Sequence, residues 1–97
     1  MNLDSSRALG LSKHADLKTR RDGCVLVLPE RAIRIGGSGA EILRLVEQGR
    51  NARFVLTEMG DRYPDSPDVA AEVPRFLEEM LGLGGILYLD DGPEKSA

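Results

Sequence analysis

The sequence predicts an α+β fold of the winged helix-turn-helix type, in which a three-stranded antiparallel sheet is followed by three helices. Two turns, Asp22-Gly23 and Pro29-Glu30, separate short apolar runs. Asp-Gly strongly favours a β-hairpin, because glycine tolerates positive φ. After residue 37, three stretches instead repeat their apolar residues at helical spacing. Strands followed by two short helices and a longer third are the parts of a winged helix-turn-helix.

The expected strands cover residues 17–21, 24–28 and 31–35. The middle run is apolar on both faces, as in a central strand. The third run alternates, with Ile33 and Ile35 on one face and Arg34 on the other. This alternation predicts an edge strand with one face toward water, and its outer edge is expected to be free.

The first helix is expected to begin at Ser38, where Ser38 and Glu41 match a capping box, and to end at Gly49. The second is expected from about residue 52 to 63. The third begins near residue 66 with Pro67 at its first position, and we expect Pro74 to kink it, because proline removes a backbone hydrogen bond. Residues 86–89 can add a last short strand.

A chain of 97 residues suits one domain. We expect a flexible arm over residues 1–14, the folded domain over 15–89 and a flexible tail over 90–97. No run of 18 apolar residues predicts a membrane span, and no secretory signal is recognised. With the single Cys24, these features predict a cytoplasmic protein. A monomer is favoured, although the free edge and the glycine-rich segments also allow a domain-swapped dimer.

Neither an enzyme nor a metal protein is indicated by the side chains. Gly36-Gly37-Ser38-Gly39 lacks the motif of a phosphate-binding loop and is interpreted as a turn. His14 and Cys24 alone supply no metal site. Residues 1–34 carry a net charge of +3 and residues 35–97 a net charge of −6, which together give the −3 of the whole chain. Because the helices are acidic, a DNA-binding winged-helix protein is the weaker alternative, and no nucleic-acid partner is expected.

Peptide binding is the function that the pattern favours. A free edge strand offers backbone donors and acceptors to an incoming peptide, and the third helix offers an apolar rim beside it. The predicted binding residues are the edge strand, Arg31, Ala32, Ile33, Arg34 and Ile35, and the helix positions Val69, Val73, Phe76, Leu77 and Met80.

Several motifs resemble the PqqD family of pyrroloquinoline quinone (PQQ) biosynthesis. They are Leu28-Pro29-Glu30-Arg31-Ala32, then Ser38-Gly39-Ala40-Glu41-Ile42-Leu43, then Arg62-Tyr63-Pro64, then the apolar run 73–77. The resemblance covers roughly residues 15–87. It implies a non-catalytic, cofactor-free chaperone that binds the precursor peptide PqqA by β-strand addition. It also implies that the chaperone presents PqqA to the radical SAM enzyme PqqE, which cross-links a Glu and a Tyr of the precursor.

Three positions depart from the family pattern. The third strand is followed by Gly36-Gly37 where the family has Leu-Asn or Leu-Asp after that strand, the first helix is followed by Gln48-Gly49 rather than Asp-Gly, and Pro74 lies inside the third helix. A recognition domain of another ribosomal peptide modification pathway is therefore the alternative within this class.

Overall fold

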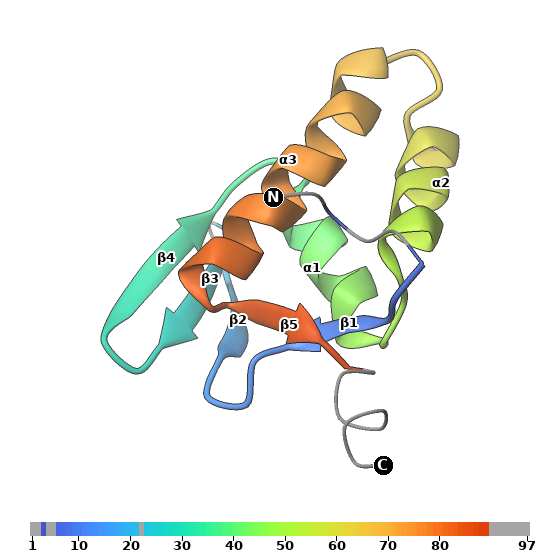
Figure 1. Cartoon of the computed structure of the whole chain (residues 1–97). Coiled ribbons are helices and arrows are strands. Elements are labelled where there is room, and N and C mark those ends of the chain that lie inside the picture. Colours follow the sequence, from blue (N-terminus) through green and yellow to red (C-terminus); the bar gives the residue numbers. More distant parts are fainter. Residues whose placement is uncertain (1–2, 4–5, 22, 90–97) are drawn as a thin grey trace, which may run out of the picture.

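The computed structural model describes residue 3, residues 6–21 and residues 23–89. In this part the chain forms two sheets and three helices (Figure 1). The larger sheet has the strand order β2-β3-β4 and the smaller one joins β1 to β5. The elements are β1 Leu9–Leu11, β2 Asp16–Arg20, β3 Gly23–Leu28, β4 Arg31–Ile35, α1 Gly39–Glu47, α2 Ala52–Arg62, α3 Pro67–Leu83 and β5 Ile86–Tyr88. The predicted α+β arrangement of three antiparallel strands followed by three helices is confirmed.

The β2-β3-β4 sheet is antiparallel throughout, and its register brings Leu17, Leu26 and Ile33 side by side. Leu26 is fully buried, so this row belongs to the face that packs on the helices. The first hairpin is one residue off the prediction, because β2 ends at Arg20 and pairs there with Gly23. Gly23 has φ = 140°, so glycine's tolerance of positive φ is used at the first residue of β3.

The N-terminal segment corrects the expectation of a flexible arm over residues 1–14. Leu9–Leu11 form β1, which pairs antiparallel with β5 at the other end of the chain. The Leu9 side chain is fully buried, and its backbone N–H donates to the Arg50 carbonyl at 3.0 Å. The N-terminal segment therefore contributes Leu9 to the hydrophobic core. The expected tail over residues 90–97 lies outside the described residues.

The capping box predicted at the start of α1 does not form. Ser38 is the N-cap residue but has helical backbone angles, and its side chain makes no capping hydrogen bond. The Glu41 carboxylate instead accepts hydrogen bonds from Arg62 at 3.1 Å and from the Tyr63 hydroxyl, which ties α1 to the end of α2. The bond to Glu41, assisted by burial and by the carboxylate charge, raises the pKa of Tyr63 above its usual value.

The remaining helix ends follow the sequence signals. Gly49, with φ = 82°, follows α1 and supplies the predicted stop. Asn51 caps α2, because its side chain accepts from the Phe54 backbone N–H at 2.8 Å. Pro67 occupies the first turn of α3 as predicted, and α3 continues as one helix through Pro74. No helix in the described ranges combines the length and the apolar character that a membrane crossing needs.

Candidate peptide-binding site

Strand β4 lies at an edge of the larger sheet. In the described part of the chain β3 is its neighbour on one side, and no strand pairs with its other side. Leu28 and Arg31 flank the Pro29-Glu30 turn and pair with each other. Because hydrogen-bonded and non-hydrogen-bonded pairs alternate along an antiparallel ladder, the backbone N–H and C=O groups of Ala32 and Arg34 are expected to point outward.

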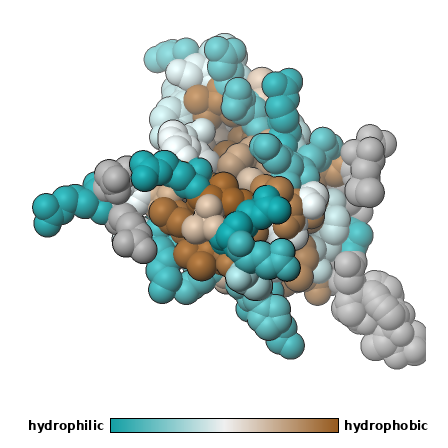
Figure 2. All heavy atoms as spheres, turned by 90° about the vertical axis from the view of Figure 1, so that its left-hand side faces the viewer, coloured by the Kyte–Doolittle hydropathy of each residue, from teal (hydrophilic) through white to brown (hydrophobic). Residues whose placement is uncertain are grey.

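Helix α3 lies beside this edge, and two separate hollows lie at the ends of the surface between the two elements, which we call the groove. One hollow, of about 240 Å³, lies between the β3–β4 turn and the C-terminal end of α3, and Arg31 and Leu83 line it. The other, of about 230 Å³, lies where β4 leads into α1, and Gly36, Glu72 and Phe76 line it. Strand β4 therefore runs antiparallel to α3. Figure 2 shows this side of the molecule, where apolar atoms gather in the middle and hydrophilic residues surround them.

The predicted strand residues have the expected exposure. Arg31, Ala32 and Arg34 are exposed, Ile33 is half-buried, and Ile35 is buried against the helices. All five residues thus lie on the edge strand, with the Ile33 and Ile35 side chains turned inward. Whether a peptide pairs with them stays a prediction.

The helix residues only partly match the prediction of an accessible rim. Val69 and Phe76 are half-buried. Val73, Leu77 and Met80 are core residues, with exposed fractions of 1%, 0% and 3%. Their side chains therefore contribute almost no accessible surface, and their contact with a peptide stays a prediction. The rim of α3 that lines the groove is instead formed by Glu72, Phe76 and Leu83, the last of which is 37% exposed.

Sequence reasoning missed Glu72 and Leu83, although a signal was present. Steps of four and seven residues from Phe76 lead to these two positions, which lie on one stripe of a helix. Glu72 is charged and therefore lies outside the apolar pattern of the helix, and Leu83 stands between Gly82 and Gly84, which predict a helix end.

The glycine-rich turn serves packing. A β-carbon on Gly39 would lie 2.9 Å from Ile35 Cγ2 and 3.1 Å from Phe76 Cε1, so this position accepts no side chain without movement. Gly37 has φ = 55°, which favours glycine. The Glu72 carboxylate also lines this hollow and would repel a phosphate. The interpretation as a turn is therefore supported over that of a phosphate-binding loop.

Replacing Gly39 by alanine is expected to destabilise the fold by about 1–2 kcal/mol, because crowding against Ile35 and Phe76 outweighs the helix propensity of alanine. Gly36→Ala is the matched control in the same turn, since nothing lies within 4 Å of a β-carbon there. Urea unfolding measures both variants. Equal unfolding free energies for the two variants would contradict the packing role of Gly39.

The residues considered above for metal binding, His14 and Cys24, do not line either hollow. His14 is exposed before β2, and Cys24 is buried in β3 with its sulfur 3.8 Å from the Thr19 hydroxyl. Across the described ranges, no cluster of three or more His, Cys, Asp or Glu side chains could hold a metal ion.

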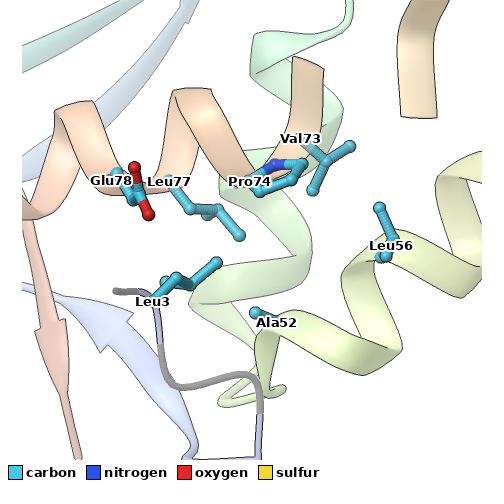
Figure 3. Close-up of a pocket in the computed structure, with 7 residues that line it drawn as sticks. All are labelled: Leu3, Ala52, Leu56, Val73, Pro74, Leu77 and Glu78. Atoms are coloured by element: carbon cyan, nitrogen blue, oxygen red, sulfur yellow. The ribbon is translucent and has the colours of Figure 1, made fainter. Parts of the chain in front are cut away.

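A third cavity, of about 350 Å³, lies on another side of α3, between α3 and α2. Figure 3 shows Pro74 and Leu77 projecting from α3 toward Ala52 on α2, with Leu3 of the N-terminal segment lying between the helices. Because Val73 and Leu77 line this cavity, two of the predicted helix residues face α2 rather than β4.

These features define a small α+β domain with an open sheet edge beside a long helix, and comparisons with known proteins give its family. The family model described as "Coenzyme PQQ synthesis protein D (PqqD)" matches residues 23–86. The match spans more than half of the chain. The chain belongs to the PqqD family.

Named relatives and a solved structure agree with this family. A "PqqA binding protein" of Pseudomonas paraeruginosa is 29% identical over 77 residues, which cover 79% of this chain and 84% of that protein. A "PqqA binding protein" of Pseudomonas putida strain W619 is 32% identical over 60 residues, covering 62% of this chain and 66% of that protein.

The solution NMR structure of the PqqD truncation of Methylobacterium extorquens PqqCD has a similar fold. The TM-score is 0.70 at 18% identity, and the match covers 88% of this chain and 94% of that one. That protein is described as a functional, stand-alone recognition element for ribosomally synthesised and post-translationally modified peptides.

Proposed function

We propose that this protein is a non-catalytic chaperone of PQQ biosynthesis that binds the precursor peptide PqqA and presents it to the radical SAM enzyme PqqE. Membership of the PqqD family supports the pathway, and relatives that bear the name PqqA binding protein support the ligand. In this proposal PqqA adds to β4 as a fourth strand, and its side chains enter the groove along α3.

The observation that carries the proposal is the open edge of β4 beside the lined groove. Backbone groups at Ala32 and Arg34 would supply hydrogen bonds that do not depend on the peptide's sequence, whereas Phe76 and Leu83 would supply selectivity. The two cationic side chains of β4, Arg31 and Arg34, are exposed on the same strand. Because no described strand pairs with the outer edge of β4, strand addition needs no opening of the core.

Two other functions are less well supported. DNA recognition would use α3, but this helix exposes more carboxylates than the single cation Arg75, which disfavours contact with phosphates. The exposed carboxylates are the four residues Asp68, Glu72, Glu78 and Glu79. Recognition of a precursor from another peptide modification pathway would use the same groove, and only the identity of the peptide separates it from the main proposal.

Titration of ¹⁵N-labelled protein with PqqA tests the site. We expect amide shifts along Arg31–Ile35 and at Phe76 and Leu83, together with slowed hydrogen exchange at Ala32, because a paired peptide would cover this amide. Shifts confined to β2 would overturn strand addition at β4. Binding of a different precursor in place of PqqA would support the alternative pathway.

Transfer to PqqE needs a separate measurement. Purified PqqE should modify PqqA faster when this protein is present at a concentration that saturates the peptide. A rate unchanged by the protein, with PqqA still bound at β4, would remove the presentation step and leave the peptide-binding role.

A further inference from the structure

The separation of the two hollows can be estimated from the elements that line them. Along α3, Phe76 and Leu83 are about 10 Å apart, from a rise of about 1.5 Å per residue. Along β4, Arg31 and the residue that follows the strand, Gly36, are at most about 17 Å apart, from about 3.4 Å per residue. We therefore expect the two hollows to lie about 10 to 17 Å from one another, and of the even residue spacings along a strand only four falls in this range.

The separation of the hollows determines how many positions along an extended peptide must lie between the two side chains that occupy them. Side chains two, four or six positions apart project from the same face of a strand, and four positions span about 14 Å. A spacing of three or five would send one of the two side chains away from α3. Hollows of about 240 Å³ and 230 Å³ suit a medium-sized apolar side chain each.

Charge differs between the two ends. Glu72 is the charged side chain that lines the hollow beside Phe76. At the other hollow Glu30 and Arg31 both contribute, so that their charges offset each other. A basic residue is therefore favoured beside Glu72 alone. Because every pair in the sheet is antiparallel, an added strand is expected to continue that pattern, which places its N-terminal part beside Glu72.

We infer that the groove recognises a peptide with two apolar residues four positions apart and a Lys or Arg next to the N-terminal one of the pair. This inference rests on the proposed strand addition at β4 and specifies its ligand. The N-terminal apolar side chain would occupy the hollow of Phe76, and the C-terminal one the hollow of Leu83.

Selection from a displayed library of random peptides on the folded protein tests the inference. Peptides retained by the wild-type protein but not by Ala32→Pro should be enriched in apolar pairs at this spacing, with a basic residue on the N-terminal side. A synthetic peptide with the spacing reduced to three should bind about tenfold or more weakly, because one apolar anchor is lost.

Two variants test which end of the peptide lies at which hollow. Glu72→Lys should replace the basic preference by an acidic one, with an effect of about two- to fivefold as for an exposed ion pair. Leu83→Ala should weaken the preference for the C-terminal apolar residue alone. Enrichment of another spacing, or of basic residues on the C-terminal side, would overturn the inference while strand addition stands. Enriched peptides that bind wild type and Ala32→Pro equally would instead overturn strand addition at β4.

Discussion

Replacing Leu9 by alanine is expected to lower the free energy of unfolding by about 2–5 kcal/mol. The Leu9 side chain is fully buried, so the change leaves a cavity as well as removing apolar contact. The residue also holds β1 in place, because its N–H donates to Arg50 and its pairing partner is Tyr88 of β5. Urea unfolding followed by circular dichroism measures the change.

Leu87→Ala is the matched control for Leu9→Ala. Leu87 belongs to the same two-stranded sheet but is 38% exposed, so its loss should cost far less, within about 0.5 kcal/mol. If both variants unfold at the same urea concentration, the N-terminal segment is not part of the cooperative core.

Replacing Ala32 by proline is expected to weaken PqqA binding by about tenfold or more while leaving the protein folded. Proline removes the backbone donor that β4 turns outward and places its ring where a paired peptide would lie. An edge strand tolerates proline when the lost N–H faces solvent. Isothermal titration measures the affinity, and thermal unfolding verifies the fold.

Thr19→Pro provides the control on the opposite edge of the sheet. Thr19 lies on β2 and pairs with Cys24, and the alternation of the ladder turns its backbone outward as at Ala32. This variant should bind PqqA as the wild type does. Loss of binding in Thr19→Pro with retention in Ala32→Pro would move the peptide to β2.

Local sequence signals were sufficient to predict most of the larger sheet and of the helices. The Pro29-Glu30 turn, the Gly49 stop and Pro67 each act within a few residues, so the sequence shows them directly. The position of β4 at the sheet edge also followed from its alternation. These features need no knowledge of distant contacts.

Long-range contacts explain what could not be predicted. Strand β1 is three residues long and has a partner at the far end of the chain, so nothing near Leu9 identifies it as a strand. Glu41 matched a capping box, yet Arg62 and Tyr63 of α2 bind its carboxylate. The α3 residues that line the hollows differ from the predicted ones for a related reason. Helix α2 and strand β4 lie on different sides of α3, and the apolar stripe of α3 alone does not show which part of it faces which element.

Pairing of β1 with β5 has a consequence for how such a domain can be attached to other proteins. The Leu89 N–H donates to the Ala8 carbonyl at 2.8 Å, so residues 8 and 89 lie at neighbouring points. Those points lie across the molecule from β4 (Figure 1). A short linker after Leu89 could therefore join this domain to an enzyme and keep the groove open. The tethered groove would hold its peptide at a high effective concentration near the active site.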